Sequence, residues 1–165
     1  MRQLYANGGI VEVFGGPESG RTSYVKACLK ECSKLPPCIV TTAFTEYVGF
    51  PRAYHMSATN SLFLIPAIRE LLFCKRTDSV VIDPLQDFAL EAESVQKWVM
   101  QQLPTLLLPL YYAKAVLYII NNDSYVPTST ASKTRILTTP GGKFFSVAAD
   151  CRVFCPHAKV PPITV

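Results

Sequence analysis

The sequence predicts an α/β fold in which helices flank a central, mainly parallel sheet. Apolar segments of strand length alternate along the chain with segments whose apolar residues recur at helical spacing. The strand segments are almost continuously apolar, as expected when helices cover both faces of a sheet. The chain has 165 residues, so we expect one domain over residues 1–156 and a proline-containing tail over residues 157–165.

The first part of the chain predicts a strand, a helix and a second strand. Residues 10–14 form an apolar run typical of a buried strand. Residues 22–33 carry apolar side chains three and four positions apart, which predicts a helix. Two prolines end the connection that follows, and residues 38–42 are rich in β-branched side chains, which predicts the second strand.

The middle of the chain continues this alternation. Residues 45–60 show no clear period and predict a loop, whereas residues 61–73 predict a helix with one proline in its first turns, where proline is tolerated. Residues 78–83 predict a third strand, which ends in a carboxylate. Residues 88–112 predict helix, with breaks at the two prolines in its second half.

The last part of the chain predicts further strands around a polar segment. Residues 115–120 are apolar and predict a fourth strand. Residues 123–139 are polar with little periodicity and predict a loop. After a Pro-Gly-Gly turn, residues 144–155 predict one or two more strands.

The composition bounds the class of protein. Apolar residues make up 49% of the chain and charged residues 17%, so a sizeable core is available and global disorder is excluded. This apolar content also suggests that a partner covers one face. The net charge of +4 permits contact with nucleic acid without requiring it. We expect no membrane span, because Pro104, Pro109 and Lys114 interrupt the longest apolar stretch.

The turn between the first strand and the first helix has the spacing of a phosphate-binding loop. Such loops read G-x-x-x-x-G-K-[ST], follow a strand and open a helix. Their backbone N–H groups form a concavity for anions, to which the helix N-terminus adds. An ordinary turn before a helix is the alternative reading. The nucleotide-binding residues predicted here are Gly15, Gly16, Pro17, Glu18, Ser19, Gly20, Arg21, Thr22 and Ser23.

One position departs from this motif. Arg21 stands where the motif has lysine. Arginine keeps the positive charge, but it is a planar fork whereas lysine is a compact point charge, so the exchange is not conservative. We therefore expect nucleotide binding to survive better than fast hydrolysis.

Polar residues follow several of the predicted strands. In a parallel sheet the carboxyl ends of the strands meet at one edge, where ligands bind. Thr41, Asp83 and Asn121 would thus lie beside the glycine-rich loop. A carboxylate at that place can orient magnesium together with the hydroxyl of Thr22, directly or through water. The cofactors that this arrangement predicts are ATP and Mg²⁺.

The order of these parts resembles the RecA-type recombinase ATPases, and their eukaryotic paralogues in particular. Residues 9–23 match the glycine-rich strand-and-loop opening of that family, and residues 80–83 match its acidic strand. Residues 116–122 match the strand that ends in a phosphate-sensing pair, and residues 140–153 match a glycine pair with its following strand. The resemblance implies a RecA-like P-loop core, with Asn122 as the phosphate sensor.

The resemblance also implies a biological role. It suggests an accessory recombinase paralogue that binds ATP and single-stranded DNA, acts with recombinase or paralogue subunits in homologous recombination and DNA repair, and is nuclear. Residues 123–139 occupy the place of a DNA-binding loop, with Lys133, Arg135 and, just beyond it, Lys143 as the candidate DNA contacts. A solvated surface loop is the equal alternative for this segment.

Departures from the family limit the expected activity. The loop lysine is Arg21, and residues 41–43 read Thr-Thr-Ala where the family has a catalytic glutamate, with Glu46 nearby. The sensing pair is Asn121–Asn122 instead of Asn-Gln, and we expect no N-terminal helical domain. The resemblance therefore implies a degenerate paralogue that is at most a weak DNA-dependent ATPase, and no catalytic residue is assigned.

Two other function classes remain open. One is a pseudo-ATPase that binds no nucleotide and serves only as a protein-interaction subunit. The other is a small phosphotransferase, which is ranked last because residues 45–60 lack the arginine cluster of a lid. The six cysteines show no metal-ligand spacing, so reduced thiols are expected and no metal beyond nucleotide-bound magnesium.

Overall fold

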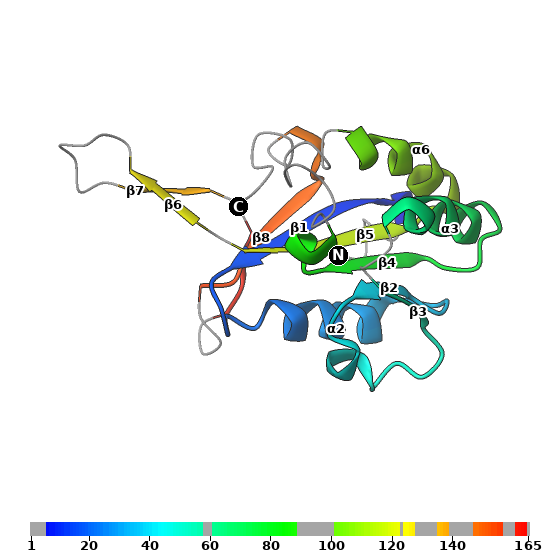
Figure 1. The fold of residues 1–165 in the computed structure, drawn as a ribbon, viewed down its shortest axis with the longest axis horizontal. Coiled ribbons are helices and arrows are strands. Elements are labelled where there is room, and N and C mark those ends of the chain that lie inside the picture. Colours follow the sequence, from blue (N-terminus) through cyan, green and yellow to red (C-terminus); the bar gives the residue numbers. More distant parts are fainter. Residues whose placement is uncertain are drawn as a thin grey trace.

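The fold is a seven-stranded sheet with helices on both faces (Figure 1). The computed structural model describes residues 6–57, 61–88, 101–122, 124–127, 135–138, 147–156 and 161–164. The strand order is β3-β2-β4-β5-β1-β8-β9, and every neighbouring pair is parallel except β8 and β9. The strands are β1 (Gly9–Gly15), β2 (Cys38–Thr41), β3 (Tyr54–Ser57), β4 (Ser79–Asp83), β5 (Val116–Asn122), β8 (Cys151–Phe154) and β9 (Ile163–Thr164).

The helices form one layer on each side of the sheet. Helix α2 (Arg21–Cys32) covers one face, and α3 (Ser61–Phe73) with α6 (Pro104–Ala113) covers the other (Figure 1). A short 3-10 helix, η1 (Phe44–Tyr47), follows β2, and a single turn of helix, α4 (Leu85–Phe88), follows β4. The predicted α/β class with a mainly parallel sheet is confirmed. No helix in the described part of the chain is long and apolar enough to cross a membrane.

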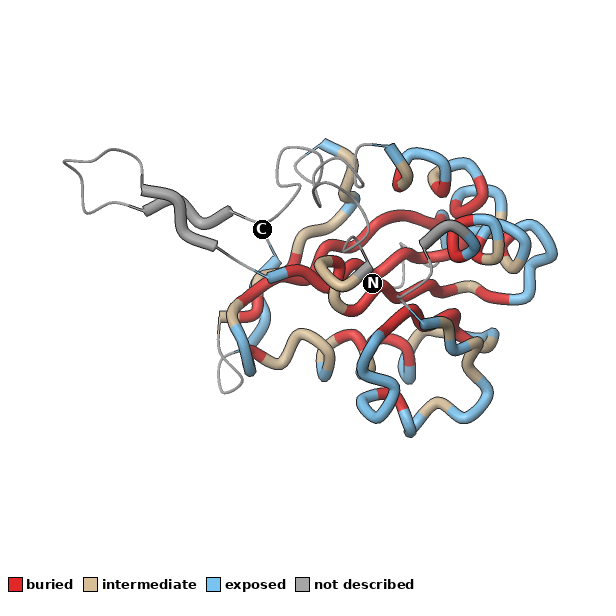
Figure 2. The backbone as a smooth tube through the Cα atoms, in the orientation of Figure 1, coloured by how far each residue is buried: buried red, intermediate tan, exposed pale blue. Residues whose placement is uncertain are grey.

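The core consists of two apolar layers separated by the sheet (Figure 2). Strands β1, β4 and β2 are buried at every position, and β5 is buried up to its last residue. Successive residues of a strand point to opposite faces, so a continuously apolar strand serves both layers. Each large apolar side chain that is fully buried contributes about 1.5–3 kcal/mol. These central strands therefore fix the positions of the loops that leave their carboxyl ends.

Helix α6 differs in detail from the prediction. The second half of the predicted long helix begins at Pro104, where proline fits because the first helical N–H needs no partner inside the helix. Helix α6 then continues through Pro109, where a break was predicted. Pro109, Leu106 and Leu110 are buried against the sheet, and this packing outweighs the lost backbone hydrogen bond. Residues 89–100, also predicted to be helical, lie outside the described residues.

Two segments predicted as loops contain strands. Within residues 45–60, β3 pairs in parallel with β2 at the edge of the sheet. Its residues are alternately half-buried and exposed, so it has no apolar run that would have marked it. Within residues 123–139, β6 (Ser124–Pro127) and β7 (Arg135–Thr138) form an antiparallel hairpin beyond the end of β5. Figure 1 shows this hairpin projecting from the carboxyl edge of the sheet.

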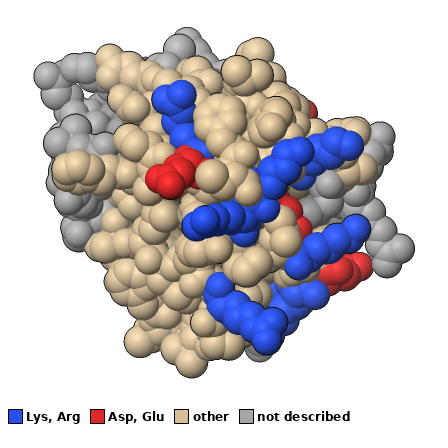
Figure 3. All heavy atoms as spheres, turned by 90° about the vertical axis from the view of Figure 1, so that its right-hand side faces the viewer, with Lys and Arg blue, Asp and Glu red and all other residues tan. Residues whose placement is uncertain are grey.

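The two edges of the sheet differ in charge. Figure 3 views the amino edge, where the strands begin and the helices end, and Lys and Arg side chains gather there. Every exposed Lys or Arg among the described side chains lies in the second half of α2 or α3 or in a loop leading into a strand: Lys30, Lys34, Arg52, Arg69, Lys75, Arg76 and Lys114. The carboxyl edge instead holds the glycine-rich loop.

Candidate functional site

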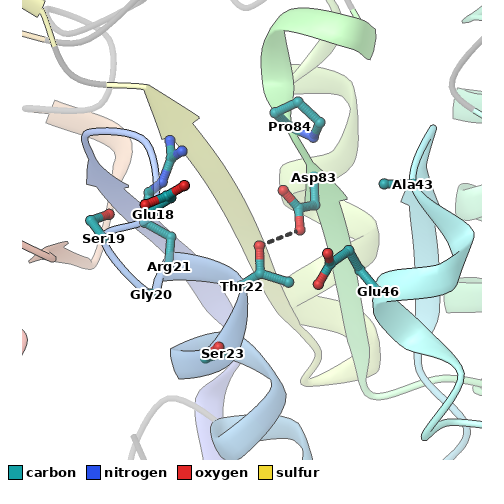
Figure 4. Close-up of a pocket in the computed structure, with 10 residues that line it drawn as sticks. All are labelled: Glu18, Ser19, Gly20, Arg21, Thr22, Ser23, Ala43, Glu46, Asp83 and Pro84. Atoms are coloured by element: carbon teal, nitrogen blue, oxygen red, sulfur yellow. Dashed lines mark hydrogen bonds between the residues drawn. The ribbon is translucent and has the colours of Figure 1, made fainter. Parts of the chain in front are cut away.

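A cavity of about 440 Å³ opens at the carboxyl edge of the sheet. The loop after β1 and the start of α2 form one wall, and the ends of β2 and β4 form the other (Figure 4). The cavity therefore lies where the sequence predicts that the strand ends converge. The lining residues are Glu18, Ser19, Gly20, Arg21, Thr22, Ser23, Ala43, Glu46, Asp83 and Pro84.

The loop between β1 and α2 is shaped by its glycines. Gly20 has a φ of 84°, a left-handed conformation that glycine adopts without steric cost, and Glu18 has a φ of 56°. Gly15 is packed closely, because a Cβ placed there would lie 2.2 Å from the carbonyl oxygen of Cys155 and 2.7 Å from Ser19 Oγ. The loop is thus pressed against the end of β8, and a side chain at Gly15 would push it away.

The start of α2 offers unused hydrogen-bond donors to the cavity. No side chain caps this helix, and its first turn carries no acidic residue. The Tyr24 N–H donates to Gly20 O at 2.9 Å, whereas Thr22 and Ser23 N–H find no acceptor within the described residues. Ser19 Oγ is buried and also has no partner in the described part. Donors of this kind beside a cavity fit the phosphates of a nucleotide.

Thr22 and Asp83 meet across the cavity. Thr22 Oγ1 donates to Asp83 Oδ2 at 2.9 Å, which joins α2 to the end of β4 (Figure 4). Tyr47 Oη donates to the same carboxylate oxygen at 2.7 Å, and Tyr47 is fully buried. A hydroxyl and a carboxylate side by side are oxygen ligands of the kind that Mg²⁺ takes in nucleotide sites.

The ionisation of Asp83 reflects this surrounding. Burial raises the pKa of Asp83 above its usual value, while the hydrogen bonds from Tyr47 and Thr22 and the charge of Arg21 act in the opposite direction. Burial also raises the pKa of Tyr47, and the nearby Asp83 charge adds to this, so its hydroxyl keeps its proton. Tyr47 is therefore a donor that holds the Asp83 carboxylate in place.

Arg21 turns toward the end of β5 instead of toward Asp83. Its Nη1 donates to Asn121 O at 2.5 Å and to Asn122 Oδ1 at 2.6 Å. In Figure 4 the guanidinium lies on the Glu18 side of the loop, away from Asp83. The fork of arginine thus bridges the glycine-rich loop and the strand that carries the predicted sensing residue. Both hydrogen bonds come from the one nitrogen Nη1, at the end of the long arginine side chain.

The end of β2 carries no carboxylate at the place of the family's catalytic glutamate. Thr41 Oγ1 accepts the Ala43 N–H at 2.9 Å, and the Thr42 hydroxyl hydrogen-bonds to Asp87. Glu46 reaches the cavity from η1, and its carboxylate lies 3.5 Å from Lys26 Nζ. Glu46 thus supplies a carboxylate from the segment after β2, and it forms an exposed ion pair with Lys26 of α2.

A buried polar network lies beside the site and was not predicted from the sequence. Arg152 Nε donates to Glu12 Oε2 at 2.6 Å, and Asn121 Nδ2 donates to Glu12 Oε1 at 3.0 Å. Gln86 Nε2 donates to Asn121 Oδ1 at 2.7 Å. Glu12 is fully buried in β1. The network ties α4, β5, β1 and β8 together and fixes the backbone of Asn121, to which Arg21 binds.

The structure brings together most of the predicted site. Thr22 lies against Asp83, and Arg21 lies against the exposed Asn122. Their roles as nucleotide, magnesium and phosphate-sensing residues stay predictions. Lys133 and Lys143 lie outside the described residues, and for Arg135 only the backbone, in β7, is described.

Tyr47 is the contact that sequence reasoning missed. It lies in residues 45–60, which were predicted as a loop, six residues beyond the end of β2. Aromatic residues in this loop were the only available signal, and aromatic residues are common in ordinary cores. Its contact with Asp83 depends on the packing of η1, which no local pattern reveals.

Comparison with known proteins identifies the fold. No protein-family model and no curated protein sequence matches the chain. Among solved structures, the chain is similar to a KaiC-like protein from the hyperthermophilic archaeon Pyrococcus horikoshii OT3, with a TM-score of 0.57 and 15% sequence identity. The match covers 90% of this chain and 71% of the other. The chain therefore has the RecA-like α/β fold that the sequence predicts.

Proposed function

We propose that this protein binds ATP with a magnesium ion in the cavity between the glycine-rich loop and the end of β4. The observation that carries the proposal is the contact of Thr22 Oγ1 with Asp83 Oδ2 at 2.9 Å, on the wall of the cavity. In a strand–loop–helix context, these two residue types at these two places suit magnesium and phosphate together. The RecA-like fold supports nucleotide binding at this edge.

Each wall of the cavity has a distinct part in this proposal. The N–H groups at the start of α2 and the hydroxyl of Ser19 would contact the phosphates. Thr22 and Asp83 would hold the magnesium ion, Asp83 directly or through water. When bound, magnesium neutralises charge on the outer phosphates. Tyr47 positions Asp83 through its hydrogen bond.

We expect turnover to be slow or absent. Hydrolysis needs a group that orients or activates water near the outer phosphate. Glu46 is the nearest carboxylate on the β2 side, and it lies in an ion pair with Lys26, at 3.5 Å. Arg21 stands in place of lysine, and its side chain donates hydrogen bonds to Asn121 and Asn122. The protein would therefore be a nucleotide-dependent binding module and at most a weak DNA-dependent ATPase.

The wider role that we propose is that of an accessory recombinase paralogue. In this role the protein acts in the nucleus, within a complex that supports homologous recombination and DNA repair, and Lys133, Arg135 and Lys143 contact single-stranded DNA. The order of motifs and the RecA-like fold support this proposal. Exposed apolar side chains on the α3 and α6 layer support a recombinase-type partner: Phe63 is 71% exposed and Leu108 is 74% exposed.

The test is equilibrium binding of a fluorescent ATP analogue in the presence of magnesium. The wild type is compared with the double variant Arg21→Ala/Thr22→Ala. A matched control, Arg69→Ala/Thr105→Ala, removes the same two residue types from exposed positions of α3 and α6. We expect the site variant to bind at least about tenfold more weakly, equivalent to about 1.4 kcal/mol, and the control to bind like the wild type.

Two outcomes would reject the proposal. Saturable binding that the site variant leaves unchanged would place the nucleotide elsewhere on the protein. Absence of binding to the folded wild type at millimolar nucleotide would favour the alternative, a pseudo-ATPase that acts only as an interaction subunit. Circular dichroism of each variant establishes that it is folded.

A further inference from the structure

The strongest feature outside the cavity is a basic surface at the opposite edge of the sheet (Figure 3). We call it the amino-edge patch and define it by four exposed cations and two exposed aromatic rings. The cations are Lys34, Lys75, Arg76 and Lys114, and the rings are those of Phe73 and Tyr112. The patch lies where α2, α3 and α6 end and where β2, β4 and β5 begin.

Backbone contacts place the cations beside one another. Asp78 lies between the two helical layers and accepts the Lys34 N–H at 2.7 Å with its carboxylate. Its carbonyl oxygen accepts the Val116 N–H at 2.9 Å, which brings the segment around Lys114 alongside. Arg76 is two residues before Asp78 in the chain. The cations therefore form a strip that crosses the edge of the sheet from the α2 side to the α6 side.

The four cations form no ion pair within the described structure, although Lys75 contacts the ring of Tyr112. None of them forms an ion pair with another described residue, whereas the half-buried cations are engaged: Arg21 with Asn121 and Asn122, Lys26 with Glu46, and Arg152 with Glu12. The Asp78 carboxylate between them is occupied by the Ser33 and Ser79 hydroxyls and the Lys34 and Leu35 N–H groups. No described carboxylate therefore forms an ion pair with these four cations.

The backbone at two of these lysines is unfavourable. Lys75 has a φ of 50° and Lys114 a φ of 54°, at the ends of α3 and α6. Helices often end in this left-handed conformation, and glycine is the usual residue there because a Cβ is strained. A lysine near a helix C-terminus does gain from the helix dipole. Both lysines thus place a positive charge at a helix C-terminus on the same surface.

Aromatic rings lie among the cations. Lys75 Nζ lies 4.9 Å from the centre of the Tyr112 ring, and the Phe73 and Tyr112 rings are 5.9 Å apart. Tyr112 is 56% exposed and Phe73 is 44% exposed. Rings beside cations are the combination that binds single-stranded nucleic acid, because bases stack on the rings while phosphates pair with the cations.

We propose that the amino-edge patch binds single-stranded nucleic acid through its phosphates and bases. An acidic protein segment would also complement the positive charge of the patch. It would not stack on the two exposed rings, so the rings favour nucleic acid. The site is distinct from the carboxyl edge, which holds both the cavity and the β6–β7 hairpin (Figure 1). The proposal does not depend on nucleotide binding in the cavity.

The test measures fluorescence anisotropy of a labelled oligodeoxythymidine at several salt concentrations. The patch variant is Lys34→Gln/Lys75→Gly/Arg76→Gln/Lys114→Gly, in which glycine suits the left-handed positions, so its thermal stability should match or exceed that of the wild type. The comparison variant, Lys133→Gln/Arg135→Gln/Lys143→Gln, removes the three candidate DNA contacts that the family resemblance suggests. We expect the patch variant to bind the oligonucleotide at least about tenfold more weakly. We also expect the slope of log K against log salt concentration to become less steep by roughly 3, about 0.7 for each lost phosphate contact.

A second variant tests the rings separately. Phe73→Leu/Tyr112→Leu keeps the charge and apolar character of the surface but removes stacking. We expect it to weaken binding of the single strand by about tenfold and to leave binding of a duplex of the same length unchanged.

Three results would overturn the proposal. The first is a folded patch variant that binds the oligonucleotide like the wild type. The second is a ring variant whose affinity falls equally for single strand and duplex, or does not fall at all. Either result would mean that binding depends on charge alone. The third is a wild type that binds poly-glutamate but no oligonucleotide, which would assign the patch to an acidic protein partner.

Discussion

Asp83 is the residue on which the site depends most. It accepts hydrogen bonds from Thr22 and Tyr47 on one oxygen, and it lies at the end of a strand buried on both faces. Burial raises its pKa, so the ionised carboxylate is costly until a cation compensates it. A carboxylate that is kept buried at a cost in folding stability is typical of a ligand site.

The first prediction concerns Asp83 and pH. Because the folded protein holds the Asp83 proton more tightly than the unfolded chain, ionising Asp83 destabilises the fold. Without magnesium, the stability that the protonated Asp83 carboxyl contributes is fully present below the unfolded pKa of about 3.9. It is lost as the pH rises through the raised pKa of the folded protein. Asp83→Asn should therefore lose less stability than the wild type over that range. Urea unfolding of both proteins at a series of pH values measures this difference in unfolding free energy.

The control for this prediction is Glu70→Gln, which removes one carboxylate from an exposed position of α3. Its stability should follow pH as the wild type does. If Asp83→Asn and the control showed the same pH dependence as the wild type, the buried carboxylate would not be costly, and its assignment as a cation site would lose its physical basis.

Arg21 shows what a sequence can and cannot reveal at the scale of a residue. The sequence identifies arginine at the lysine position of the loop, and this alone predicts altered chemistry. The direction of the side chain depends on the end of β5, a hundred residues later, where Asn121 O and Asn122 Oδ1 accept its hydrogen bonds. Local sequence patterns carry no information on such a contact. For the same reason they did not reveal the hydrogen bond from Tyr47 to Asp83.

At the scale of elements, the glycine-rich loop is held in place by its contact with the end of β8. A Cβ at Gly15 would lie 2.2 Å from Cys155 O, which is backbone and cannot move aside freely. We predict that Gly15→Ala destabilises the protein by about 2 kcal/mol, as overpacking does, and weakens ATP-analogue binding. Chemical denaturation and the binding titration measure the two effects.

Gly49→Ala is the matched control, because nothing lies within 4 Å of a Cβ at that position. It should change stability by no more than about 0.5 kcal/mol. Equal behaviour of the two variants would mean that the loop has room beside β8, contrary to the packing seen in the structure.

The central strands are joined by the buried network of Glu12, Asn121 and Arg152. Removing the cation takes from the fully buried Glu12 the ion pair that it forms with Arg152. We predict that Arg152→Met destabilises the protein by about 3 kcal/mol. The double variant Glu12→Leu/Arg152→Met should recover most of this loss, because it removes the buried charge as well. Unfolding free energies of both variants measure the effect, and failure of the double variant to recover would contradict the ion-pair account.

The elements were predictable to different degrees for physical reasons. Strands β1, β2, β4 and β5 were found because strands covered on both faces must be apolar throughout. The edge strand β3 was missed because it has no continuous apolar run, and the β6–β7 hairpin was missed because it lies outside the main sheet. Helix α6 contradicts the break predicted at Pro109 because its packing on the sheet outweighs local propensity.

At the scale of the whole molecule, the two edges of the sheet have different chemistry. The carboxyl edge holds the cavity, with uncapped N–H groups and a buried carboxylate, and the amino edge holds the exposed cations. The position of the cavity was predictable because parallel strands end at a common edge. The amino-edge patch was not predicted, because its cations come from three separate connections that only the fold brings together.

The most direct test of the account is the magnesium dependence of ATP binding, measured by calorimetry in the wild type and in Thr22→Val. Valine has the shape of threonine but lacks the hydroxyl that contacts Asp83. We predict that magnesium strengthens binding to the wild type by about tenfold or more, equivalent to at least 1.4 kcal/mol, and has little effect on the variant. Equal magnesium dependence in both proteins, or no binding to the folded wild type, would contradict the account.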